Sequence, residues 1–126
     1  MSKIVNSSIR QKILAARPRA LEPLEVPEWD TTVWIKELTL KERDVFEKQQ
    51  IIRGEDGSMS MDTMGLKARL IILCVCDEDG NQVFSQEDEV AVNELGAAVM
   101  EKVFSACQRV NKMRKQDTEE ASAPLA

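Results

Sequence analysis

The segment LKARLIILCVC, residues 66–76, is apolar on nearly every face when it is drawn as a helix. Its apolar side chains include Leu66, Leu70, Ile71, Ile72, Leu73 and Val75. A helix that is apolar all round is buried on all sides. We therefore expect a central helix over residues 66–75, around which the rest of this 126-residue chain packs as one domain.

On the C-terminal side of this segment, residues 85–113 predict the longest helix of the chain. Ser85 and Asp88 have the spacing of a helix cap. Apolar residues then recur at helical intervals and form one stripe: Val92, Leu95, Val99, Val103, Ala106, Cys107, Val110 and Met113. The stripe predicts an amphipathic helix that packs along the central one.

On the N-terminal side, Thr39 and Glu42 have the spacing of a capping box, in which each side chain accepts a hydrogen bond from a backbone amide at the start of a helix. We expect a helix from this box to about Arg53. The following residues, GEDGSMSMDTMG (54–65), are rich in Gly, Asp, Ser and Met and predict a flexible connection. Asp62 is placed to cap the central helix.

The first 36 residues predict a short helix and a β-hairpin. The helix covers residues 7–16 and ends before Pro18. Residues 24–26 are expected to pair with residues 32–36, where apolar Val33 and Ile35 alternate with their neighbours, and the chain turns at residues 28–31. Pro23 and Pro27 cannot donate to a ladder, so the first strand should lie at an edge.

These elements together predict a mainly α fold, a small helical domain with an N-terminal β-hairpin and a long C-terminal amphipathic helix. We expect a basic N-terminal arm with the short helix at residues 1–23, and a single globular domain at residues 24–113. Residues 114–126 have no hydrophobic periodicity and predict a disordered tail.

Composition excludes several classes of function. The chain has no histidine, no glycine-rich phosphate loop and no pairing of a nucleophile with a base, so we expect no enzyme activity and no cofactor. It has no apolar run near the roughly 20 residues needed to cross a bilayer and no secretory signal at its start, which predicts a cytosolic protein without membrane contact. Cys74, Cys76 and Cys107 lie in apolar surroundings and are expected to be reduced core residues.

Charge is unevenly distributed along the chain. Residues 1–20 carry five basic side chains and no acidic one, while the whole chain carries −5, so the remaining residues carry −10. A basic arm could bind nucleic acid or the acidic surface of a neighbouring copy. Because the acidic body would repel phosphates, we do not expect nucleic acid as a partner.

Residues 77–88, DEDGNQVFSQED, have the spacing of a calcium-binding EF-hand loop. Asp77, Asp79, Asn81 and Asp88 fall at positions that supply oxygen ligands. However, Gln82 stands where such loops need Gly, and Asp88 is shorter than the usual Glu. We favour a simple tight turn at residues 79–81, and keep a calcium-responsive binding module as the alternative function.

The remaining candidate contacts are apolar. Met59, Met61 and Met64 form an adaptable patch that is either a binding surface or a cover over the core. Apolar content on the long helix exceeds what one small core needs, so Val92, Val99, Val103 and Met113 are further candidates for contacts with a client or with other copies. We expect a homo-oligomer.

Residues 24–112 resemble a tail assembly chaperone of long-tailed, siphovirus-type bacteriophages. The similarity rests on the hairpin with Trp29 and Trp34, the helix start ELTLKERDVFE (37–47), the apolar helix, the segment CDEDGNQVFSQED (76–88) and the long final helix. None of these pieces is a catalytic signature.

This resemblance implies a role in the cytoplasm of the host cell. A member of the family binds the tape measure protein, a very long helical polypeptide, and keeps it soluble until the tail tube polymerises around it. It is absent from the mature virion. The family also implies a longer, frameshifted form that recruits the tail tube protein, in which case this chain is the short form.

Overall fold

A computed structural model describes residues 7–16 and 20–113 of the chain. The expected tail at residues 114–126, and residues 1–6 and 17–19 of the expected basic arm, lie outside the described residues. In chain order the elements are α1 (Ser7–Ala15), β1 (Leu21–Val26), a 3-10 turn η1 (Pro27–Trp29), β2 (Thr31–Lys36), α2 (Leu40–Gln49), β3 (Ile51–Arg53), β4 (Met59–Met61), α3 (Leu66–Cys74), β5 (Val75–Cys76), a 3-10 turn η2 (Gln86–Asp88), α4 (Glu89–Asn93) and α5 (Ala97–Val110).

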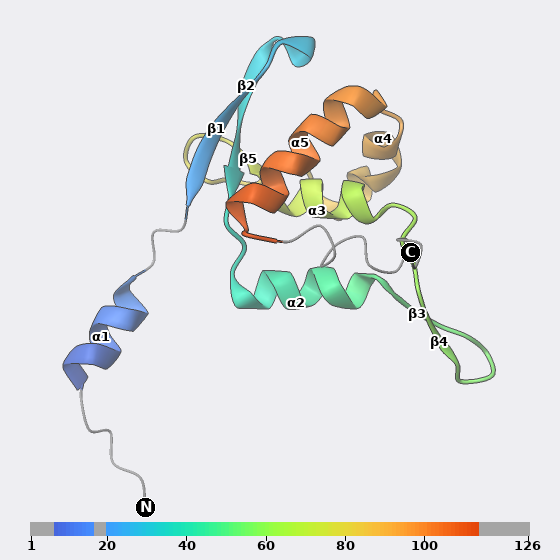
Figure 1. The fold of residues 1–126 in the computed structure, drawn as a ribbon, viewed down its shortest axis with the longest axis horizontal. Coiled ribbons are helices and arrows are strands. Elements are labelled where there is room, and N and C mark those ends of the chain that lie inside the picture. The colour runs from blue at the N-terminus through green and yellow to red at the C-terminus, as the bar shows by residue number, and fades with distance from the viewer. Residues whose placement is uncertain (1–6, 17–19, 114–126) are drawn as a thin grey trace, which may run out of the picture.

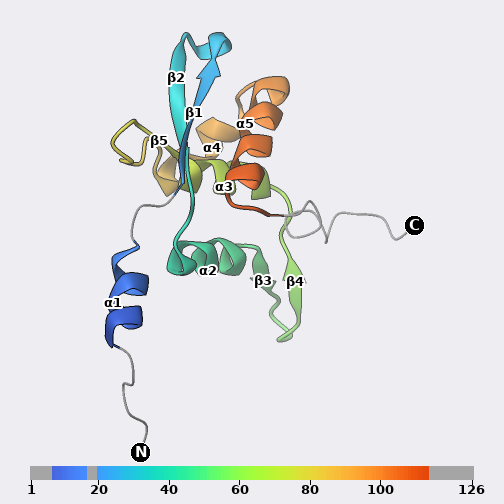
Figure 2. The same ribbon diagram turned by 60° about the vertical axis from the view of Figure 1, so that its left-hand side comes forward.

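The fold is mixed α/β, and the prediction of a mainly α fold is wrong. Strands β1, β2 and β5 form an antiparallel sheet in the order β1-β2-β5, and β3 pairs with β4 in a second, two-stranded sheet. The expected flexible connection after α2 is in part this second hairpin, which projects from the body (Figures 1 and 2). No helix in the described part of the chain has the length and apolar character that a bilayer crossing requires.

The central position of α3 is confirmed. Every residue of α3 except Lys67 is buried, and the helix lies between α2 and α5, with β5 continuing directly from its end (Figure 1). The helix stops one residue earlier than expected, because Val75 and Cys76 become extended and pair with Ile35 and Trp34 of β2. The chain thus passes from the central helix straight into the sheet.

The N-terminal hairpin and the short helix α1 are also confirmed. Strand β1 is longer than expected and pairs along its whole length with β2, from Leu21 opposite Lys36 to Val26 opposite Thr31. Val33 and Ile35 are buried in the core, and β1 lies at the sheet edge as its prolines predict. The sheet therefore covers the side of the core that faces α3 and α5.

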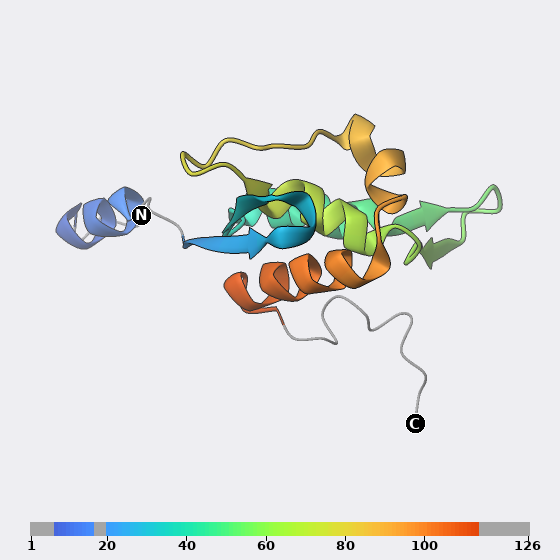
Figure 3. The ribbon, with the colours of Figure 1, turned by 90° about the horizontal axis from the view of Figure 1, so that it is seen from above.

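Both predicted capping boxes form, but the helices that follow them differ from expectation. Thr39 and Glu42 cap α2, which ends at Gln49 because residues 51–53 enter β3. Ser85 and Asp88 cap η2. The expected helix over residues 85–113 is divided into α4 and α5, because Gly96 has extended backbone angles and starts α5 afresh. Seen from above, α4 and α5 turn away from each other at this point (Figure 3).

Asn111 joins the end of α5 to the connection between β2 and α2. Its side-chain oxygen accepts a hydrogen bond from the amide of Leu38 at 2.7 Å. Its side-chain nitrogen donates to the carbonyl oxygens of Cys107 at 2.9 Å and Lys36 at 3.3 Å. Because Asn111 is buried, water would not replace its side chain as the hydrogen-bond partner of these backbone groups.

We predict that Asn111→Ala lowers the free energy of unfolding by about 2 kcal/mol, because it leaves the buried amide of Leu38 without its acceptor. Urea denaturation measures the change. Asn93→Ala is the matched control: Asn93 is exposed and bonds only the local carbonyl of Glu89 among the hydrogen bonds described, so we expect less than about 0.5 kcal/mol. Equal losses in the two variants would contradict this role of Asn111.

Candidate partner-binding surface

The hairpin formed by β3 and β4 is exposed along its whole length. Ile51 pairs with Met61, Ile52 with Ser60 and Arg53 with Met59, and all six residues are exposed. At the tip, the hydroxyl and the amide of Ser58 donate hydrogen bonds to Asp56, which lower the pKa of that carboxyl. The tip is therefore closed by local hydrogen bonds and needs no support from the body.

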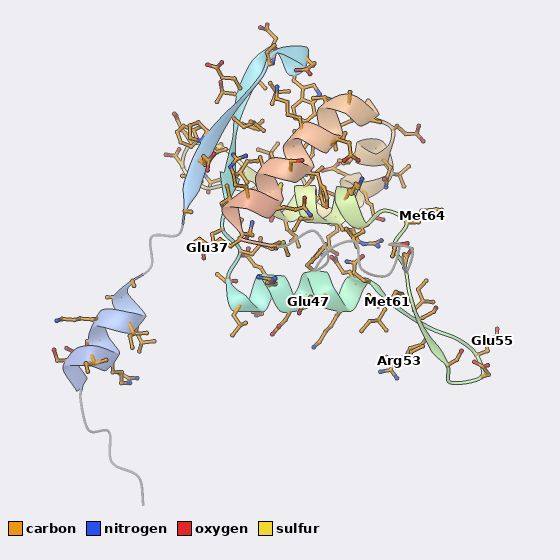
Figure 4. The ribbon with its side chains drawn as sticks, in the orientation of Figure 1. Glu37, Glu47, Arg53, Glu55, Met61 and Met64 are labelled. Carbon is orange, nitrogen blue, oxygen red and sulfur yellow. The ribbon has the colours of Figure 1, made fainter. Side chains whose placement is uncertain are left out.

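Five large apolar side chains are exposed on this hairpin and directly after it: Ile51, Ile52, Met59, Met61 and Met64. We call this set the hairpin surface. The exposed fraction is 60% for Met59 and 85% for Met64. Residues directly opposite each other in an antiparallel pair share a face, so Ile51 and Met61 form one apolar pair. Figure 4 shows Met61 and Met64 near the base of the hairpin and the charged residues Arg53 and Glu55 farther out.

Arg69 of α3 anchors the base of the hairpin. One guanidinium nitrogen, Nη2, donates to the backbone carbonyl oxygens of Asp62 at 2.9 Å and Met64 at 3.1 Å, and to the side-chain oxygen of Gln50 at 2.7 Å. The other, Nη1, lies 3.4 Å from an Asp62 carboxylate oxygen and 3.3 Å from one of Glu89. Arg69 is only 8% exposed, so these bonds form in a largely dehydrated site.

Gln50 and Gly65 complete this anchor. The side-chain nitrogen of Gln50 donates to the carbonyl oxygen of Phe46 at 2.6 Å, which ties the end of α2 to Arg69. Gly65 has a positive φ of 82°, and a Cβ there would lie 3.2 Å from a Glu89 carboxylate oxygen and 3.3 Å from Nη1 of Arg69. Gly65 is thus the N-cap of α3 in place of the expected Asp62, whose carboxylate accepts from the amide of Met64 instead.

The structure separates the predicted contact residues into two groups. Met59, Met61 and Met64 lie together on the hairpin surface. Val92, Val99, Val103 and Met113 are buried and pack inside the subunit. These four belong to the core clusters of the subunit, so we restrict the candidate surface to the hairpin.

The segment proposed as a calcium loop is a turn closed on itself. The Asp77 carboxylate accepts from the amides of Asp79 and Asn81, both at 2.9 Å, and the Asn81 amide is the main cause of a lowered pKa of Asp77. The Asp88 carboxylate accepts from the Ser85 amide at 2.8 Å. Strand β5 precedes the loop where an EF-hand has a helix, η2 forms its last three residues, and α4 follows it. The described residues contain no group of three side chains that could hold a metal ion. The geometry therefore does not support the calcium-binding alternative.

The three cysteines are buried and free, as expected for core residues. Burial raises the pKa of Cys107, and the neighbouring Cys74 adds to the effect. The Cys107 thiol therefore stays protonated and unreactive at neutral pH.

The structure thus defines a small α/β protein that holds an apolar hairpin outside its core, the kind of surface that binds other polypeptides. Its fold is similar to a solved structure of the tail assembly chaperone of bacteriophage HK97, with a TM-score of 0.57 and 22% sequence identity. The match covers 82% of this chain and 98% of that one. At this identity the likeness is evidence of the fold alone.

A family model described as phage tail assembly chaperone matches residues 8–122. The chain therefore belongs to the phage tail assembly chaperone family, which confirms the resemblance found in the sequence. A comparison with curated proteins gives no match. The role that the family establishes is that of a chaperone in viral tail assembly.

We predict that Arg69→Met lowers the free energy of unfolding by about 2–4 kcal/mol, because it leaves Gln50 and two backbone carbonyls without their donor and the two carboxylates without their partner. Amide hydrogen exchange of residues 50–62 should accelerate more than exchange in α5. Arg43→Met is the control: Arg43 makes a partly exposed ion pair with Glu47 at 4.0 Å, so its loss should cost less than about 0.5 kcal/mol. Unchanged exchange in the hairpin of Arg69→Met would contradict the anchor.

We predict that calcium up to millimolar concentration leaves the melting temperature unchanged, because Asp77 and Asp88 already accept backbone hydrogen bonds. A ligand that binds only the native state must raise the melting temperature. Magnesium at the same concentration controls for ionic strength. A rise specific to calcium, abolished by Asp79→Asn, would restore the alternative function.

Proposed function

We propose that this chaperone binds the tape measure protein through the hairpin surface and keeps it soluble in the host cytoplasm until the tail tube polymerises. The observation that carries the proposal is the hairpin surface itself, a set of exposed isoleucine and methionine side chains on a rigidly anchored hairpin. The family supports a partner among phage tail proteins.

Methionine suits a client with many different apolar faces. Its side chain is unbranched and polarizable, so it adapts to irregular partners at little cost. A long helical polypeptide presents apolar stripes whose side chains vary from one segment to the next. Met59 and Met61 share one face of the hairpin with Ile51 and can cover such stripes without requiring one sequence, while the charges of Glu55 and Asp56 at the tip remain in water.

We base the finer features of the role on the small size of the hairpin and on the family resemblance. One hairpin buries little area, so we propose that several copies associate along one client and that their weak contacts add. A longer form would bring the tail tube protein to this assembly. We further propose that the chain acts without catalysis, binds neither nucleic acid nor membrane, and leaves before the virion is complete.

We predict that the triple variant M59S/M61S/M64S weakens binding to the tape measure protein at least ten-fold, because three buried thioether side chains would be lost from the contact. Co-expression measures the soluble fraction of the tape measure protein, and titration calorimetry measures the affinity for a purified segment.

Val90→Ser is the matched control, since Val90 is an exposed apolar residue of α4 that does not belong to the hairpin surface. It should leave both readouts at the wild-type level. Unchanged binding by the triple variant, with unfolding still cooperative, would rule out the hairpin surface as the client site.

A further inference from the structure

The charges of the chain are segregated into two segments of opposite sign. Residues 1–20 carry five basic side chains and no acidic one. Residues 70–101 carry eight acidic side chains and no basic one. Neither segment includes the hairpin surface, so this complementarity is separate from the proposed client site.

The acidic segment borders an open groove of about 530 Å³. Its lining residues are Leu73, Gln82, Val83, Phe84, Ser85, Gln86 and Asp88. Val83 is 52% exposed although it is apolar, and Phe84 is half-buried against the core. Glu78 and Glu87 are exposed on the same stretch of chain. The groove thus places the apolar side chains of Leu73, Val83 and Phe84 beside polar ones and the Asp88 carboxylate.

Helix α1 has the complementary character. Ile9, Ile13 and Leu14 are exposed, with Ile13 at 66%, and Arg10 and Lys12 are exposed between them. Ile9 and Ile13 are one turn apart and lie on one face of the helix. In all three ribbon views α1 stands apart from the body of its own subunit (Figures 1, 2 and 3).

The length of α1 sets the size of the contact that it can make. A helix of nine residues is about 13 Å long, so one face of α1 presents two turns of apolar side chains. No described residue of α1 lines the groove of its own subunit, so the groove is open to a helix from a second copy.

We propose that α1 of one copy docks in the groove of a second copy, with Ile13 against Val83 and Phe84, and with Arg10 and Lys12 beside Glu78 and Glu87. This inference rests on the self-association put forward under the proposed function and names its contact. The helix and the groove are different surfaces, so each copy can take a neighbour at both, and association does not stop at a dimer.

Sedimentation velocity of the full chain over a range of concentrations tests the proposal. Ile13→Asp and Val83→Asp should each weaken self-association at least ten-fold, because each places a charge in the apolar contact. Both residues are exposed in the subunit, so the fold is preserved. Leu40→Asp, an exposed apolar residue of α2, is the matched control and should associate like the wild type. Raising the salt concentration should also weaken association.

Reversing the charges of α1 or of the groove region shows whether α1 docks on a second copy or on its own subunit. R10E/K12E and E78K/E87K should each associate poorly alone and associate together when mixed. Failure of the mixture to associate, or wild-type association of Ile13→Asp and Val83→Asp, would overturn the docking of α1 while leaving self-association by another contact open. A monomeric wild type at every concentration would overturn self-association as well, whereas client binding by the hairpin surface is measured separately.

Discussion

The fold depends on the need to satisfy one buried guanidinium. Helix α3 is surrounded by the core, and Arg69 is the cation on its buried face. A buried charge is tolerated only when it is paired and hydrogen-bonded, so the surrounding chain must bring oxygen atoms to it. They come from Gln50 at the end of α2, from Asp62 and Met64 at the base of the hairpin, and from Glu89 of α4. One side chain thereby fixes how three segments meet the central helix.

This constraint explains how an apolar hairpin can remain outside the core. A two-stranded hairpin by itself is marginal in water. Here both of its ends are held, because the amide of Asp62 donates to the carbonyl of Gln50 and both residues bond Arg69. The side chains of Ile51, Met59 and Met61 can therefore stay exposed without the hairpin collapsing onto the body. Stability comes from the anchor, which leaves the apolar side chains available to a client.

The sequence predicted the features that local rules determine. The central helix, the first hairpin and both capping boxes follow from periodicity and cap chemistry. The second hairpin was missed because only three residues pair on each side, and Gly54 and Gly57 resemble those of a loop. The chain becomes extended at β5 because it pairs there with the edge of β2 that β1 leaves free. No local sequence pattern reveals this pairing. The three methionines were identified as candidates, but Arg69 was not. Its signal was a cation on the buried side of an apolar helix, and its partners come only from the tertiary structure.

Hydrogen exchange measured by mass spectrometry tests most directly whether the hairpin holds the client. The full chain is compared alone and in complex with a segment of the tape measure protein. If the hairpin is the proposed client site, amides of residues 51–64 exchange more slowly in the complex than in the free chain, while exchange in α5 is unchanged. Slower exchange elsewhere, with residues 51–64 exchanging at the same rate in both samples, would contradict it.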